Sequence, residues 1–159
     1  MDENHLPIFG IGPYLISIIG IITITSSICS HYNLIPIYKI NELNMVFLIL
    51  GTILIILGII FWILAVVISK IDMEVENNNL VTTGIYAYVK HPIYAAFFYI
   101  STGLILISQN ILLFVLPLIF WIFLTVAMKK TEEKWLIDRY GNDYINYSKK
   151  VNRFIPKVI

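Results

Sequence analysis

Between two long apolar runs lies the polar stretch VTTGIYAYVKHPIY, residues 81–94. Pro92 suits the first turn of a helix, where its missing N–H costs nothing, and it favours an extended His91. We therefore expect an apolar helix to begin at Pro92, at the membrane–water boundary. Its first free N–H groups can hold a carboxylate or phosphate, and Lys90 and His91 stand beside them as further donors. The stretch is interpreted as a ligand site.

The composition predicts an integral membrane protein. Of 159 residues, 58% are hydrophobic and 13% are charged, and the mean hydropathy is +0.83, too apolar for a soluble domain of this size. A net charge of +1 gives no reason to expect a nucleic-acid partner. The single cysteine, Cys29, allows no intrachain disulfide. The first apolar run lacks a basic flank and a small-residue cleavage site, so a cleaved signal peptide is not expected.

Four apolar runs fit membrane-spanning helices, at about residues 8–30, 45–69, 93–108 and 111–128. A span needs ~20 apolar residues, so the third run is slightly short. Pro13 should kink or shorten the start of the first helix. Gly51 and Gly58 lie seven residues apart on one face of the second, which would let a neighbouring helix approach closely, although glycine is also simply tolerated in membrane helices.

The turn at Gln109-Asn110 should join the third and fourth spans into a helical hairpin. The tail, residues 129–159, holds eight of the eleven basic residues. With four spans both termini share a side, and the positive-inside rule makes that side cytoplasmic. We expect a single all-α membrane domain over residues 1–159, a helical bundle of about four transmembrane helices followed by amphipathic helices.

Within the tail, Gly141 is a plausible stop for one amphipathic helix and Asn142 a plausible N-cap for the next. Three aromatic residues, Tyr144, Tyr147 and Phe154, are of the kind that lies at a membrane interface with one wet and one apolar edge. Trp121, deep in the fourth span, is interpreted as a packing or lipid-contact residue.

Two blocks of sequence carry a family resemblance. The first is LVTTGIY, residues 80–86, followed by KHPIY, residues 90–94; the second combines Glu132-Glu133 with YGNDY, residues 140–144, and RFIP, residues 153–156. In this order and separation they resemble the isoprenylcysteine carboxyl methyltransferases and related phospholipid methyltransferases. The resemblance covers residues 78–156, about half of the chain.

The resemblance implies a membrane-embedded methyltransferase that uses S-adenosylmethionine, without a soluble Rossmann domain and without a metal. Carried over by position, the implied cofactor contacts are Asn78, Asn79, Leu80, Val81, Tyr86, His91, Pro92, Ile93, Tyr94 and Glu132. Lys90 stands where the family usually has arginine, which keeps the charge but loses the bidentate fork. Asn78 stands where some members have histidine. No catalytic residue is assigned.

The residue chemistry fits such a ligand. A helix start with Lys90 and His91 suits a carboxylate, and Glu132 suits an ammonium or ribose hydroxyls. Because a hairpin returns the chain to the same membrane face, His91 and Glu132 are predicted to share one site. Simpler interpretations remain for each: His91 as an interfacial residue, Tyr86 and Tyr94 as interfacial aromatics, and the Glu132-Glu133 pair as a solvated helix start. For Glu133 the solvated interpretation is favoured.

Three functions follow as hypotheses. The favoured one is methyl transfer from S-adenosylmethionine to a lipidic or prenylated acceptor that enters from the bilayer. The alternatives are a membrane reductase using NADPH, as in the sterol reductases with a similar C-terminal half, and a small membrane protein without enzymatic activity. Two carboxylates beside a polyphosphate would be unfavourable, which argues against the reductase.

One further position, residue 128, indicates which class of methyl acceptor the protein uses. In the carboxyl methyltransferases an arginine four residues before the first glutamate is the expected partner of the substrate carboxylate. Here Met128 occupies that position and cannot bind a carboxylate. Lys129 and Lys130 point ~100° and ~200° away along a helix. We therefore expect that the protein does not require a prenylcysteine carboxylate and instead methylates an amine or a small apolar acceptor.

Overall fold

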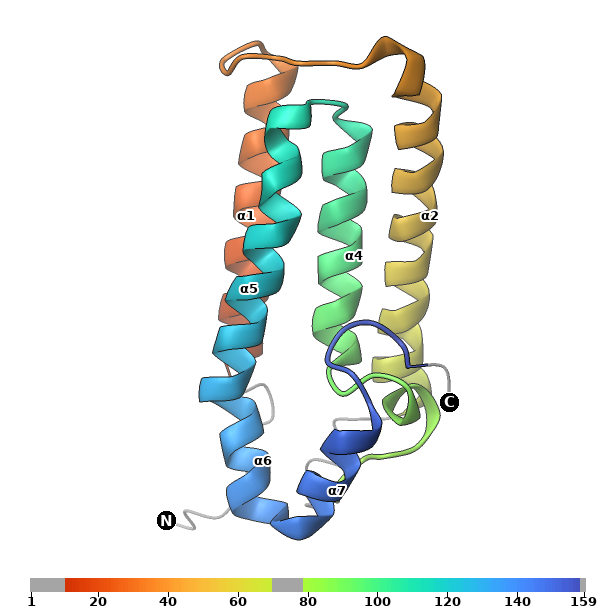
Figure 1. The fold of residues 1–159 in the computed structure, drawn as a ribbon, viewed down its shortest axis with the longest axis vertical. Helices are drawn as coiled ribbons and strands as arrows, with labels where there is room; N and C mark the ends of the chain where they lie inside the picture. Colours follow the sequence, from red (N-terminus) through yellow and green to blue (C-terminus); the bar gives the residue numbers. More distant parts are fainter. Residues whose placement is uncertain (1–10, 70–78, 158–159) are drawn as a thin grey trace.

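The computed structural model describes residues 11–69 and 79–157, which form helices joined by short connections (Figure 1). Four long helices, α1, α2, α4 and α5, lie side by side. Three segments are long and apolar enough to cross a membrane: Gly12–His31, Asn41–Ile68 and Ile111–Tyr140. The chain is an all-α integral membrane bundle, as predicted. That residues 1–159 form one domain stays a prediction.

The first two spans begin and end close to their predicted positions. Helix α1 runs Gly12–His31 with Pro13 in its first turn. Residues 8–10 of the predicted span lie outside the described residues. Helix α2 runs Asn44–Trp62 and continues as a π-helical turn, Ile63–Ile68, which replaces the regular helix predicted to residue 69.

Helix α4, Pro92–Ile107, is the centre of the bundle and is shorter than α1 and α2. Its 16 residues rise ~24 Å, less than the ~30 Å of a bilayer core. It begins at Pro92, as predicted, and is followed by Gln109, whose backbone has φ +56°. The hairpin then continues through a 3-10 turn, Ile111–Phe114, into α5, Val115–Lys130. The predicted hairpin is confirmed.

Small residues bring α2 and α4 into close contact. A Cβ added at Gly51 would lie 2.6 Å from the carbonyl oxygen of Gly103, and one added at Gly58 would lie 2.6 Å from that of Ala96. Both separations are impossible for real atoms, so only glycine fits on α2. Gly51 and Gly58 therefore form the close-approach face that their spacing predicted.

At the bundle end away from Pro92, buried Asn110 joins three segments. Its side-chain nitrogen donates to Ser30 Oγ at 3.1 Å and to the Pro36 carbonyl at 3.0 Å. Its side-chain oxygen accepts from the backbone N–H of Tyr38 and of Leu112, both at 3.2 Å. Asn110 thus fixes the connector after α1 to the hairpin turn, a role that the sequence did not predict.

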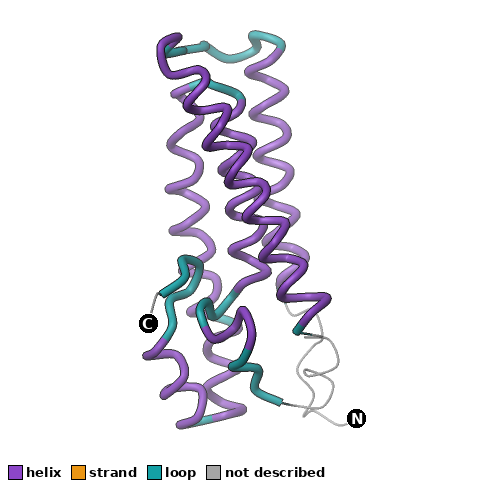
Figure 2. Tube along the Cα trace, turned by 90° about the vertical axis from the view of Figure 1, so that its right-hand side faces the viewer, coloured by secondary structure: helices purple, strands orange, loops and turns teal. Residues whose placement is uncertain are grey.

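The tail forms α6, Glu132–Tyr140, and α7, Asn142–Lys150, which lie at the end of the bundle where α4 begins (Figures 1 and 2). Gly141 has φ +52° and ends α6, as predicted. The prediction of Asn142 as an N-cap is wrong by one position, because Asn142 is already helical and Gly141 occupies the cap.

The interfacial placement of the tail aromatics is also wrong. Tyr144, Tyr147 and Phe154 are buried within the protein. They are covered because the tail folds back onto the loop that precedes α4, so that Tyr147 donates its hydroxyl proton to the Tyr86 carbonyl at 2.7 Å. An aromatic residue suits either a membrane interface or a protein core, and the local sequence does not show which of the two it occupies.

Candidate active site

The loop before α4 is held in place by the C-terminal segment. Val89 forms a parallel bridge with Asn152. The backbone N–H of Lys90 donates to the Asn152 carbonyl at 2.8 Å, and that of His91 donates to the Arg153 carbonyl at 3.1 Å. The backbone of His91 has φ −126° and ψ 66°, so it is not helical but does not reach the extended conformation that its place before proline predicted. These contacts fix the His91 side chain at the start of α4.

Two carboxylates face His91 from the other arm of the hairpin. The helical path breaks at Thr131, with φ −123° and ψ −87°, so that α6 begins with Glu132 and Glu133 directed at α4. His91 Nδ1 lies 3.7 Å from Glu132 Oε2, and His91 Nε2 lies 3.4 Å from Glu133 Oε1. The predicted proximity of His91 and Glu132 is confirmed; their role with a cofactor is not tested by this geometry.

Glu133 is the best-anchored side chain of the cluster, which corrects its interpretation as a solvated helix start. It is only 8% exposed. Arg153 binds it with two parallel hydrogen bonds, Nε to Oε1 at 2.6 Å and Nη2 to Oε2 at 2.8 Å. Such a bidentate pair is both strong and orienting. Glu133 therefore holds His91 from one side while Arg153 holds Glu133.

The role of Arg153 was not predicted from the sequence, although this residue begins the RFIP segment, residues 153–156. The sequence feature that could have indicated a site residue is its position as a basic residue next to the aromatic Phe154. Its partner, 20 residues earlier, could not be identified without the fold.

Tyr94 ties Glu132 to α4. Its hydroxyl donates to Glu132 Oε1, and its ring packs edge-on against His91 with centroids 5.9 Å apart. The start of α1 lies against the same hydroxyl, since a Cβ added at Gly12 would be 2.8 Å from it. A side chain at residue 12 would push the Tyr94 hydroxyl aside, so glycine leaves room for Tyr94 where α1 covers the cluster.

Aromatic rings close the membrane side of the cluster. Phe154 packs between Phe98 and Trp121, with ring centroids 6.5 Å and 5.5 Å away. Tyr99 donates its hydroxyl proton to the Phe154 carbonyl at 2.8 Å. The prediction that Trp121 packs is confirmed. This apolar wall keeps water from the bundle side of His91.

Lys90 is held beside the cluster, with Nζ 3.9 Å from Glu133 Oε1. Burial lowers the pKa of Lys90; Glu133 opposes this effect, and the neighbouring charges of Arg153 and Lys129 add to it. A partly buried ammonium whose charge is not fully compensated is a suitable partner for an additional anion.

Tyr144 of α7 carries a polar atom with no partner among the described residues. Its hydroxyl is buried and makes no hydrogen bond. Burial raises the pKa of Tyr144, and the nearby Glu133 charge acts in the same direction, which keeps the phenol protonated. The hydroxyl is therefore a free donor next to the carboxylates.

The remaining predicted contacts surround the cluster less closely. Leu80 packs on Tyr144 and Tyr147, and Tyr86 is buried. Val81 and Ile93 are partly buried, Pro92 is buried, and Asn79 is exposed. Asn78 lies outside the described residues. Whether any of these residues contacts a cofactor remains a prediction.

Met128 is fully buried in the core, whereas Lys129 and Lys130 are exposed. The position expected to hold a substrate-binding arginine is thus occupied by an apolar side chain. Neither lysine points inward to replace it.

Comparison with known proteins adds independent information. A sequence profile of the phospholipid methyltransferase family matches residues 46–143. Protein-S-isoprenylcysteine O-methyltransferase of Schizosaccharomyces pombe is 40% identical over 80 residues, which are 50% of this chain and 34% of the relative. The Saccharomyces cerevisiae enzyme of the same name is 37% identical, over 48% of this chain and 32% of the relative.

A third relative carries a different name. Methanethiol S-methyltransferase 1 of Bradyrhizobium diazoefficiens is 33% identical over 45% of this chain and 24% of the relative. The matched stretch therefore spans a quarter to a third of the length of these three relatives.

Proposed function

Because the chain belongs to the phospholipid methyltransferase family, we propose that it transfers a methyl group from S-adenosylmethionine to a lipidic acceptor. The observation that carries the proposal is the cluster of His91, Glu132, Glu133 and Arg153 at one end of a membrane bundle. The names of the relatives described above favour methyl transfer over an NADPH reductase and over a protein without activity.

The residues present fit the methyl donor. Its amino-acid part carries both a carboxylate and an ammonium, and the cluster offers Lys90 for the first and Glu132 for the second. The first-turn N–H groups of α4 receive no side-chain cap, so they add donors for a carboxylate. When bound, S-adenosylmethionine supplies an electrophilic methyl group on a sulfonium.

The protein's own part in this reaction is positioning. Arg153 orients Glu133, Glu133 and Glu132 hold His91 between them, and Tyr94 fixes Glu132. The aromatic wall keeps water away. Direct displacement needs alignment and exclusion of water more than it needs a nucleophilic side chain or a metal.

The proposed acceptor does not need a carboxylate, because Met128, at the position expected to bind one, is apolar and buried. The relatives' names include an oxygen and a sulfur acceptor, so family membership leaves the accepting atom open. An amine acceptor would have to lose a proton before attack, for which His91 is the candidate base, because the tyrosines beside it keep their protons. A lipidic acceptor would enter sideways from the bilayer.

The acceptor is tested with labelled S-adenosylmethionine and the purified protein, offered either a prenylcysteine analogue or an aminolipid. We expect the aminolipid to be methylated. Efficient esterification of the prenylcysteine, undiminished in Lys129→Ala and Lys130→Ala, would defeat this part of the proposal.

The reaction type is tested by ligand binding in detergent. Wild-type protein should bind S-adenosylhomocysteine and not NADPH, and the matched control Asp138→Asn, an exposed acid on α6, should bind equally well. Binding of NADPH in its place would support the reductase. Binding of neither by folded protein would support the protein without activity.

The orientation in the membrane is a second proposal, made from the basic tail. Both termini are proposed to be cytoplasmic, which places the cluster at the cytoplasmic face. Reporter fusions at residues 1, 38, 109 and 159 test it. A cytoplasmic signal from residue 38 would contradict it.

A further inference from the structure

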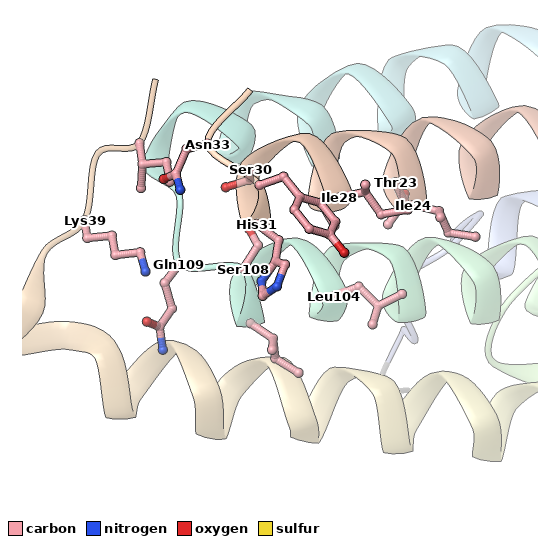
Figure 3. A pocket seen from close by; sticks show the side chains of 14 residues that line it. Thr23, Ile24, Ile28, Ser30, His31, Asn33, Lys39, Leu104, Ser108 and Gln109 are labelled. Carbon is pink, nitrogen blue, oxygen red and sulfur yellow. The ribbon is translucent and has the colours of Figure 1, made fainter. Parts of the chain in front are cut away.

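The first turn of α1 lies against the cluster around His91, although α1 is outside residues 46–143, the part that the family profile matches. Gly12 is buried there, and Leu15 and Ile19 of the same helix belong to the hydrophobic core. The last turns of α1 lie at the other end of the bundle, along a groove formed with the connector that follows α1 and the end of α4 (Figure 3). Only the beginning of α1 is therefore placed to act on the cluster.

The contact between α1 and the cluster is made through Tyr94. A Cβ added at Gly12 would lie 2.8 Å from the Tyr94 hydroxyl oxygen, closer than real Cβ atoms approach other heavy atoms. The backbone of Gly12 is helical, a conformation that any residue with a Cβ adopts as well. The space that Tyr94 needs, and not the backbone conformation, is therefore what favours glycine at residue 12.

The Tyr94 ring has little freedom to move elsewhere. It is only 7% exposed and belongs to the hydrophobic core, where close packing leaves few alternative positions. Its hydroxyl is the part that a methyl group at residue 12 would push aside. A side chain at residue 12 would therefore act on the hydrogen bond that this hydroxyl makes.

That hydrogen bond orients Glu132. The Tyr94 hydroxyl donates to Glu132 Oε1, and Glu132 Oε2 lies 3.7 Å from His91 Nδ1. The two oxygens of one carboxylate thus face two different partners, so a shift at Oε1 turns Oε2 relative to His91. A binding group that is misplaced by a fraction of its contact distance loses much of its effect on a ligand.

We propose that Gly12 is a positioning residue of the active site, because it leaves the space in which Tyr94 holds Glu132 in its binding orientation. Gly12 acts through Tyr94 and needs no contact with the methyl donor. This inference rests on the proposed function, which assigns Glu132 to the ammonium group of S-adenosylmethionine. It makes α1 a part of the site, in addition to the loop before α4, α4 itself and α6.

The test measures the binding of S-adenosylhomocysteine to the full chain in detergent. Gly12→Ala should weaken binding about fivefold, the cost of disturbing one hydrogen bond to a charged group. Tyr94→Phe removes the same hydrogen bond and should weaken binding by about the same factor. Gly20→Ala is the matched control and should bind like the wild type, because Gly20 lies in the same helix and a Cβ added there meets nothing within 4 Å.

The double variant separates positioning from a structural effect on α1. Gly12→Ala with Tyr94→Phe should bind as tightly as Tyr94→Phe alone, because the added methyl group has room once the hydroxyl is gone. Thermal unfolding without ligand should show the same coupling: Gly12→Ala should lower the melting temperature of the wild type and not that of Tyr94→Phe. A purely structural effect of residue 12 would be equal in both backgrounds.

Three results would overturn the proposal: unchanged affinity in Gly12→Ala, wild-type affinity in Tyr94→Phe, or equal losses from Gly12→Ala in both backgrounds. Failure of the proposed function gives a different result, because the wild-type protein itself would then not bind S-adenosylhomocysteine. Wild-type binding together with an unaffected Gly12→Ala would refute the positioning role alone.

Discussion

The two ends of the bundle use polar side chains in opposite ways. At the end where α4 begins, five ionisable or hydroxyl groups from three segments are paired with one another around His91. At the other end, one amide, Asn110, satisfies several groups, while the buried hydroxyls of Thr23 and Ser27 have no hydrogen-bond partner in the part of the chain that the structure describes. The first end concentrates charge that can act on a ligand, whereas the second is held together by neutral hydrogen bonds. Charged and neutral polar groups are thus separated along the length of α4.

The largest expected effect is a loss of stability when the charged cluster around His91 is disrupted. Arg153→Ala should lower the free energy of unfolding by ~3–5 kcal/mol, because it leaves Glu133 as a buried charge without its bidentate partner. Unfolding in detergent measures the loss. Arg139→Ala, an exposed arginine on α6, should change stability by less than ~0.5 kcal/mol. Similar losses for both variants would show that the pair does not anchor the cluster.

The next largest effect is a loss of stability when the hydrogen bonds of Asn110 at the other end are removed. Asn110→Ala should lower the free energy of unfolding by ~2–3 kcal/mol, because it leaves the buried Ser30 hydroxyl and partly buried backbone groups of Pro36 and Tyr38 without their partner. The affinity for S-adenosylhomocysteine, measured on folded protein, should not change. Asn146→Ala, an exposed asparagine on α7, is the control. A loss of ligand affinity in Asn110→Ala would show that the two ends are coupled.

Substitutions of the predicted cofactor contacts should change the affinity for S-adenosylmethionine rather than the stability of the fold. His91→Ala and Glu132→Gln should each weaken S-adenosylmethionine binding by ~1–3 kcal/mol, the cost of leaving a polar partner unsatisfied. Equilibrium binding to folded protein measures this effect. Unchanged affinity in Glu132→Gln would remove Glu132 from the proposed site.

The smallest effect is a pH dependence at Lys90. Its pKa in the folded protein is lowered from 10.5, chiefly by burial. Between the lowered value and 10.5 the unfolded chain binds more protons than the folded one, so the contribution of Lys90 to stability rises with pH in that window. Relative to Lys90→Met, the wild-type protein should therefore gain stability as the pH rises towards 10.5. A difference that stays constant or falls over that range would contradict the burial of the Lys90 ammonium.

The sequence by itself determined the elements that depend on local chemistry. Apolar runs of sufficient length must be helical in a membrane, Pro92 had to begin a helix, and the turn at Gln109 had to return the chain to the same face. The proximity of His91 and Glu132 follows from these features of the sequence alone. Gly51 and Gly58 identified the helix face that α4 contacts, because their spacing is a property of one helix alone.

Only the tertiary structure decided which residues complete the cluster and which end of the bundle each polar group serves. Glu133 lies in the first turn of α6 and Arg153, 20 residues later, follows the end of α7, so no periodicity relates them. The burial of Tyr144, Tyr147 and Phe154 depends on the tail folding back on the loop before α4, and the role of Asn110 depends on the connector reaching the hairpin turn. Such contacts join distant segments, and the local pattern of residues contains no information about which distant partner each will meet.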